Sequence, residues 1–199
     1  DDDRAHATLR QRLSAPKPVE LEVVKVAGDE SRRREGFAAR LAALALAARS
    51  AHHRRIAVVV NRVDTALAVY DAIMGAVKDP ETAVLVTGRM RPLDREDHER
   101  ELRSVAAGVP RDPAAPAKFV VATQCIEAGA DLDFDVLITE CASLDALVQR
   151  FGRLDRLGEH RQGRGVIAIR SDQTDDDDRV YGTSRSATWQ YLSQRSAPI

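Results

Sequence analysis

Residues 119–140 read FVVATQCIEAGADLDFDVLITE, with two apolar, β-branched runs on either side of a polar loop. The runs at 119–122 and 136–139 are short and almost wholly apolar, which is typical of strands covered on both faces. Three further runs of this kind occur at 56–60, 83–86 and 166–169. In a sixth run, 19–26, acidic and apolar residues alternate, which indicates an edge or half-exposed strand.

Apolar residues between these runs recur at helical spacing. One such pattern lies in an alanine-rich segment at 37–48, and another covers 63–77. Strands that alternate with helices predict right-handed βαβ units. We therefore expect an α/β, three-layer domain with a mostly parallel central sheet of about six strands and helices on both faces.

Two segments mark loops and boundaries. Residues 107–117 contain one glycine and three prolines, which predicts a surface loop before the strand at 119. Residues 175–178 are four consecutive aspartates, which we expect to repel one another and to bury nothing. We expect an N-terminal lead-in at 1–18, the compact sheet domain at 19–171, and an acidic linker with a tail or further element at 172–199.

Composition restricts the class of protein. The chain of 199 residues is 44% hydrophobic but has no apolar run of about 18 residues, so we expect no membrane partner. Only Cys125 and Cys141 occur, which favours reduced thiols and a cytoplasmic protein. A net charge of -1 argues against bulk electrostatic binding of nucleic acid, so locally placed arginines must provide any such role.

Residues 144–158, LDALVQRFGRLDRLG, carry the most informative polar pattern. On a helix, one stripe would face the sheet and a second would present polar groups in one direction. The first stripe comprises Leu144, Leu147, Val148 and Phe151, and the second comprises Gln149, Gly152, Arg153 and Arg156. Arginines fixed on a rigid element can place planar donors against phosphate oxygens. The alternative is an amphipathic helix with solvated arginines.

Two segments in order resemble motifs of superfamily 2 helicases. The run Gln149-Arg150-x-Gly152-Arg153-x-x-Arg156 resembles motif VI, and 121–131, VATQCIEAGAD, resembles motif V. The strand ending at Asn61 resembles motif IV, and 85–95 resembles the next strand and loop along the strand track. The combined pattern is similar to the helicase part of the CRISPR-associated helicase-nuclease of type I systems. The resemblance implies the second, C-terminal RecA-like lobe.

The resemblance also implies roles for matching positions. Arg153 and Arg156 would be arginine fingers that neutralise charge on the transferring γ-phosphoryl group of ATP. Gln149 would orient the attacking water or the γ-phosphate, and Gly129 and Asp131 would lie near the nucleotide ribose.

A strand of nucleic acid would meet a second set of residues. The resemblance implies that Thr123 contacts the backbone of the strand, and that the track continues through Asn61, Thr87, Gly88 and Arg89. Polar residues at strand ends are also often simple helix caps or turn formers.

The phosphate-binding motif of the first lobe does not occur in the sequence. Without Gly-x-x-x-x-Gly-Lys-[Ser/Thr], ATP with Mg²⁺ would be held mainly by the first lobe, and the isolated chain is predicted to be inactive. Asp29-Glu30 resembles the metal-binding pair of that lobe, but a Gly-Asp turn explains it. We interpret His52-His53 as a solvated helix end and expect no metal site.

Two functions from different classes fit these observations. The first is the second lobe of an ATP-dependent superfamily 2 helicase or translocase, with DNA unwinding in CRISPR interference, an antiviral defence, as the expected process. Its partners would be the first lobe of the same protein, single-stranded DNA or else RNA, and a CRISPR effector complex. The alternative is a non-catalytic α/β module that binds nucleic acid or phosphate on the same fold.

Overall fold

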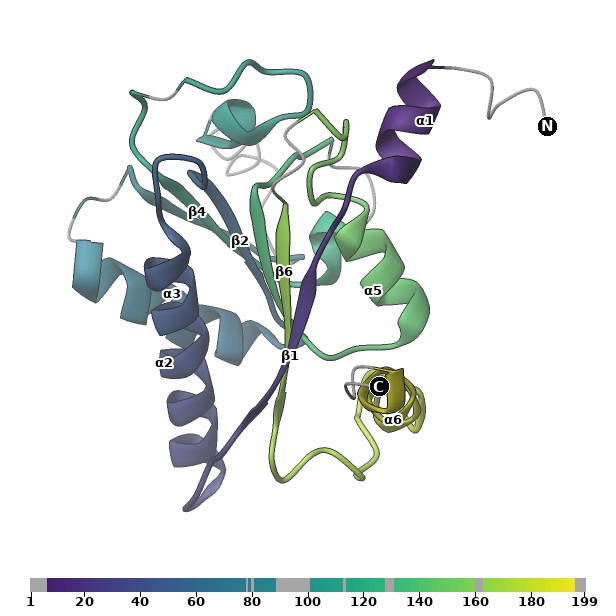
Figure 1. Cartoon of the computed structure of the whole chain (residues 1–199). Helices are drawn as coiled ribbons and strands as arrows, with labels where there is room; N and C mark the ends of the chain where they lie inside the picture. Colours follow the sequence, from purple (N-terminus) through teal and green to yellow (C-terminus); the bar gives the residue numbers. More distant parts are fainter. Residues whose placement is uncertain are drawn as a thin grey trace.

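A computed structural model shows a six-stranded sheet in which every neighbouring pair of strands is parallel (Figure 1). It describes residues 7–77, 79, 81–88, 101–112, 114–127, 131–159 and 163–195. The strands are β1 (Val19–Val24), β2 (Arg55–Val59), β3 (Ala83–Val86), β4 (Lys118–Ala122), β5 (Val136–Glu140) and β6 (Arg164–Arg170), in the order β1-β6-β5-β2-β4-β3. All six runs predicted from the sequence are confirmed as strands.

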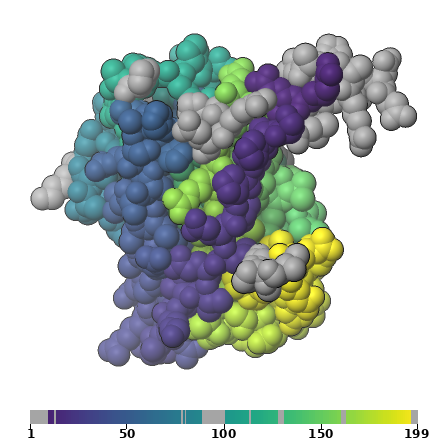
Figure 2. Space-filling model, in the orientation of Figure 1, coloured from purple at the N-terminus to yellow at the C-terminus, as the bar shows by residue number. Residues whose placement is uncertain are grey.

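The edge position predicted for the first strand is also confirmed. Among the described strands β1 pairs with β6 alone, and Val19 and Val23 are 42% and 47% exposed. The space-filling view shows this purple segment at the surface (Figure 2). The central strands β2, β4 and β5 are buried on both faces, with one half-buried position in β4, which explains why their sequences are apolar without alternation.

Helices cover both faces of the sheet (Figure 1). α2 (Glu30–Ala48) and α3 (Val63–Val77) pack on one face, where they share a core with residues such as Val58 and Ile138. α5 (Leu144–Phe151) and α6 (Ser184–Arg195) lie on the other face, beside residues such as Ile169. Short 3₁₀ turns occur at Arg103–Val105 and Gln124–Ile126. The chain therefore has the RecA-like three-layer architecture predicted from its sequence.

The start of α2 explains the Asp29-Glu30 pair. Asp29 is the N-cap, and its carboxylate accepts a hydrogen bond from the backbone N–H of Arg32 at 3.0 Å. Glu30 forms a two-pronged ion pair with Arg170 at the end of β6, with distances of 2.7 and 2.8 Å. Asp29 therefore begins the helix, and Glu30 anchors it to the sheet.

Both ends of the described chain pack against the sheet domain. In α1 (Ala7–Ser14), Arg12 Nε donates to the carbonyl of Arg156 at 2.9 Å. In α6, Trp189 is 7% exposed and packs in the cluster that contains Leu147. The expectation that the four aspartates bury nothing is wrong for Asp178, which is 6% exposed and pairs with the buried Arg185 at 2.7 Å. Its charge is tolerated because a guanidinium compensates it.

Within the part of the chain that the structure describes, no helix combines the length and the apolar character needed to span a bilayer.

Candidate nucleotide and strand interface

Polar residues gather where neighbouring parallel strands end, an edge of the sheet that we call the carboxyl edge. Asn61 follows β2, Thr123 follows β4, and Thr87 and Gly88 follow β3. Backbone hydrogen bonds join the ends of neighbouring strands. Val60 N, after β2, donates to Ala122 O of β4 at 2.9 Å, and Thr123 N, after β4, donates to Val86 O of β3 at 3.1 Å. The structure thus brings Asn61, Thr123 and Thr87 to one edge. Arg89 and Gly129 lie outside the described residues.

These candidates differ in accessibility. Asn61 and Thr123 are both 4% exposed, Thr87 is half-buried, and Gly88 is exposed. Asn61 is held on three sides: its backbone N–H donates to Glu140 Oε2, its Nδ2 donates to Cys141 O, and its Oδ1 accepts from Arg150. Its side chain therefore joins the ends of β2 and β5 to α5.

Arg150 lies at the centre of the carboxyl edge and is fully buried. A guanidinium has five N–H donors, and here each of the five has an acceptor. The acceptors are Glu127 Oε1 at 2.8 Å, Thr139 Oγ1 at 2.8 Å, Glu140 O at 3.0 Å, Asn61 Oδ1 at 3.0 Å and Tyr181 Oη at 3.0 Å. Arg150 thus links the segments that resemble motifs IV, V and VI.

Glu140 and Glu127 compensate this buried charge unequally. Burial raises the pKa of Glu140, while the backbone N–H of Asn61 and the charge of Arg150 oppose the rise. Glu127 forms the direct ion pair with Arg150 at 2.8 Å, and its side chain is 15% exposed. The arginine would be costly to bury without this carboxylate and the neutral acceptors. Neither Arg150 nor Glu127 was among the predicted site residues, although Arg150 lies inside the Gln-Arg-x-Gly-Arg signature.

The predicted inward stripe of 144–158 is confirmed for Leu147 and Phe151, which pack in the core, but is wrong for its other two members. Leu144 and Val148 were expected to face the sheet, but they are 48% and 65% exposed, whereas Ala146, Leu147 and Arg150 are buried. The physical reason is Arg150: only by facing inward do its five donors meet the acceptors at the carboxyl edge.

The predicted common stripe of polar residues is also wrong, because α5 ends at Phe151. Gly152 caps the helix, and a Cβ at this position would lie 3.1 Å from the carbonyl oxygen of Gln149. Arg153 and Arg156 therefore lie in the turn after α5, whereas Gln149 remains on the exposed side of the helix.

The turn that carries both arginines is fixed by the segment before β5. Phe134 N donates to Arg153 O at 2.8 Å, and Asp155 N donates to Phe134 O at 2.8 Å. Asp133 Oδ1 accepts the backbone N–H of Arg156, also at 2.8 Å. Phe134 is fully buried and Asp133 is 1% exposed, so the residues just after motif V hold the turn rigidly.

The side chains of Arg153 and Arg156 have different partners. Arg153 is 9% exposed, and its Nη2 donates to Glu127 O at 3.1 Å. Its buried Nε has no hydrogen-bond partner among the described residues. Burial lowers the pKa of Arg153, and the charge of Arg156 lowers it further. Arg156 pairs with the exposed Asp131, with a distance of 2.9 Å between Nε and Oδ1.

Arg153, Arg156 and Asp131 are therefore brought together, as the resemblance implied. The interactions of these two arginines leave the buried Nε–H of Arg153 able to donate a hydrogen bond to an anionic oxygen.

A parallel six-stranded sheet with motif V and motif VI joined at its carboxyl edge defines the C-terminal RecA-like lobe of a superfamily 2 helicase. Comparison with family models gives the particular group. The chain belongs to the family described as CRISPR-associated nuclease/helicase Cas3, C-terminal, whose model matches residues 52–159.

Individual relatives agree with this membership. The chain is 40% identical over 93 residues to the CRISPR-associated endonuclease/helicase Cas3 of Thermus thermophilus, covering 42% of this chain and 10% of that protein. It is 31% identical over 103 residues to the CRISPR-associated nuclease/helicase Cas3 of Methanothermobacter thermautotrophicus, covering 52% of this chain and 11% of that protein.

The fold agrees with solved structures as well. A crystal structure described as T. fusca Cas3-ATP superposes with a TM-score of 0.68 at 23% identity, covering 90% of this chain and 22% of that chain. A structure described as a CRISPR RNA-guided surveillance complex, pre-nicking, gives a TM-score of 0.67 at 20% identity, covering 92% of this chain and 23% of that chain. The chain thus spans about a tenth of the first two relatives and less than a quarter of these solved chains.

Proposed function

We propose that this chain is the second RecA-like lobe of an ATP-dependent helicase that unwinds DNA in CRISPR interference. Within the longer protein, residues 19–171 would form the compact sheet of the lobe and 1–18 would lead into it. Residues 172–199 would be an acidic linker with a tail or further element, whose helix α6 packs against the sheet domain. The first lobe of the same protein is its main partner, with single-stranded DNA and a CRISPR effector complex as further partners. The family match over residues 52–159 supports this role.

One observation carries the proposal most directly: Arg153 has a buried Nε without a partner among the described residues, beside the charge of Arg156. A buried guanidinium N–H is costly to leave unpaired, unless a bound anion supplies the acceptor. The site therefore fits a phosphoryl group, and ATP with Mg²⁺, held mainly by the first lobe, would supply it. Arg153 and Arg156 would neutralise charge that develops on that group.

Other residues would complete the nucleotide side of the interface. Gln149, on the exposed side of α5, would orient the attacking water or the γ-phosphate. Asp131 and Gly129 would lie near the ribose. Arg156 is paired with Asp131 in this structure, so it would exchange this carboxylate for a phosphoryl oxygen when the two lobes close.

The strand track would run along the ends of β2, β3 and β4. Thr123, Thr87 and Gly88 lie at consecutive strand ends, where backbone N–H groups and hydroxyls can reach phosphates. Arg89 would extend the track. Asn61 would contribute mainly by fixing the end of β2, since its side chain is engaged with Arg150 and Cys141.

ATP hydrolysis by the intact protein, measured with and without single-stranded DNA, tests this function. We expect stimulated hydrolysis and strand separation, with RNA of equal length as the comparison strand. The isolated 199-residue chain is expected to show no stimulated hydrolysis above a heat-killed control. An intact protein that binds single strands without hydrolysing ATP would instead support a non-catalytic binding module.

A further inference from the structure

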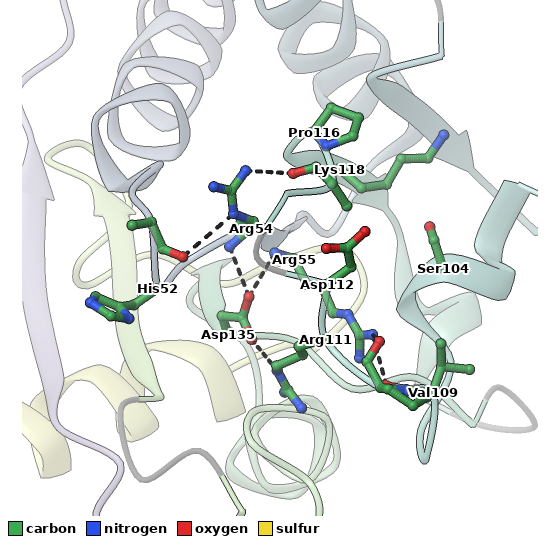
Figure 3. Close-up of a pocket in the computed structure, with 13 residues that line it drawn as sticks. His52, Arg54, Arg55, Ser104, Val109, Arg111, Asp112, Pro116, Lys118 and Asp135 are labelled. Atoms are coloured by element: carbon green, nitrogen blue, oxygen red, sulfur yellow. Dashed lines mark hydrogen bonds and ion pairs between the residues drawn. The ribbon is translucent and has the colours of Figure 1, made fainter.

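A cavity of about 430 Å³ lies at the amino-terminal ends of β2 and β4, the edge of the sheet opposite the candidate interface (Figure 3). Its walls come from 51–55, from the loop that contains Val109 and Asp112, and from the residue before β5, Asp135. The volume falls in the range of pockets that bind small molecules. Nothing in the helicase role proposed above uses this cavity.

Arg55, the first residue of β2, contributes a buried guanidinium to the wall. It is only 6% exposed, and its Nη2 donates to Val109 O at 2.9 Å and to Pro110 O at 3.2 Å. Its Nη1 is buried and has no hydrogen-bond partner among the described residues. An unpaired donor on a buried charge destabilises the fold unless a bound acceptor compensates it.

Asp135, an acid in the same wall, is already engaged by other donors. Asp135 is 2% exposed, and it accepts the backbone N–H groups of Arg54 and Arg55, both at 2.8 Å. Its other oxygen accepts from Arg111 Nε at 2.7 Å (Figure 3). Asp135 therefore orders the start of β2 and the loop that contains Arg111. It does not supply the hydrogen-bond partner that Arg55 Nη1 lacks among the described residues.

The lining selects among anions by charge and by shape. Arg54, Arg55, Arg111 and Lys118 make the wall positive, but the carboxylates of Asp112 and Asp135 in the same wall would repel a second negative charge. The cations outnumber these two carboxylates, so the wall attracts an anion, and the apolar remainder of the lining suits a carboxylate on an aliphatic body better than a fully hydrated phosphate. Small apolar groups, Ala51, Val109, Pro110, Ala115 and Pro116, provide space for a short aliphatic body.

We propose that this cavity binds a carboxylate on a short aliphatic body, with the guanidinium of Arg55 as its countercharge and Arg55 Nη1 turning toward the cavity to donate to one carboxylate oxygen. A free organic acid and an acidic side chain of a protein segment both present this chemistry.

Ligand-observed saturation-transfer NMR on the intact protein tests the proposal, with butyrate and the neutral butyramide as matched probes. We expect saturation transfer to butyrate and none to butyramide. Equal transfer to both probes, or displacement of butyrate by inorganic phosphate as effectively as by acetate, would overturn the proposal.

Two variants locate the binding. Arg55→Gln removes the charged donor, and Ser104→Phe places a ring at the exposed rim of the cavity without disturbing the buried wall. Both should abolish transfer to butyrate, and the second keeps the test valid if the first fails to fold. Ala187→Phe, at an exposed position of α6, is the matched control and should leave transfer unchanged. Undiminished transfer in Ser104→Phe contradicts the proposal.

The source of the carboxylate is settled by a second pair of probes. Displacement of butyrate by the peptide acetyl-Ala-Glu-Ala-amide at lower concentration than by free propionate points to a protein segment. The reverse order points to a small organic acid. If neither the peptide nor propionate displaces butyrate, the transfer does not report recognition of a carboxylate and the proposal is overturned.

Discussion

Arg150 Nη2 donates to Asn61 Oδ1 at 3.0 Å, which joins the helix after β5 to a residue that follows β2, 89 positions earlier in the sequence. Both side chains are buried, so this hydrogen bond forms where water cannot replace it. The carboxyl edge is therefore rigidly packed next to the turn that carries Arg153 and Arg156.

Replacing Arg150 should destabilise the lobe severely. Arg150→Ala removes the partner of Glu127 and leaves Asn61 and Thr139 with unpaired polar atoms, for which we expect a loss of about 3–5 kcal/mol in the free energy of unfolding. The neighbouring Gln149→Ala, at an exposed position, should change it by no more than about 0.5 kcal/mol. Denaturant unfolding of both variants measures the two losses of unfolding free energy. Similar losses would contradict the role of Arg150 as the buried centre of the hydrogen bonds at the carboxyl edge.

The ring of Phe151 should leave no room for a side chain at position 165. A Cβ at Gly165 would lie 2.4 Å from Phe151 Cε1, so Gly165→Ala must displace the ring at the end of α5. We expect a loss of about 1–3 kcal/mol in unfolding free energy, partly recovered by adding Phe151→Leu.

Gly36 provides the matched control for this substitution. It lies inside α2, where an added Cβ meets no atom within 4 Å. Gly36→Ala should therefore stabilise the protein by about 0.5–1 kcal/mol. Thermal unfolding of both alanine variants checks that the two changes in stability have opposite signs. A stabilising Gly165→Ala would show that Phe151 does not pack as described.

Cys141 should resist alkylation in the folded protein. Burial raises the pKa of its thiol to about 12, so at pH 8 only about one thiol in ten thousand is the reactive thiolate. Iodoacetamide labelling followed by peptide mapping should modify the half-buried Cys125 well before Cys141, and both equally after unfolding. Prompt labelling of Cys141 in the native state would contradict its burial.

The sheet was predictable because buried parallel strands leave a local signal. The runs at 56–60, 83–86, 119–122, 136–139 and 166–169 are wholly or almost wholly apolar, and the alternating run at 19–26 correctly indicated the edge. The resemblance to helicase motifs likewise placed Arg153 and Asp131 in one region.

The orientation of α5 could not be predicted from its own sequence. Leu144 and Val148 look like core residues, but they border an apolar groove with Leu21 and Leu192 and remain exposed. The inward position of Arg150 depends on acceptors that are distant in sequence, such as Asn61 and Tyr181. Hydropathy periodicity contains no information about such long-range hydrogen bonds.

The hydrolysis rate of Arg153→Ala and Arg156→Ala in the intact protein tests the central claim most directly. If both side chains neutralise charge on the transferring phosphoryl group, each substitution should lower kcat for DNA-stimulated ATP hydrolysis by about 10³-fold or more. Nucleotide affinity and thermal stability should change much less, and the exposed Arg32→Ala, on α2, should retain full turnover. Near-normal hydrolysis in both Arg153→Ala and Arg156→Ala would contradict the account and leave the lobe as a binding module.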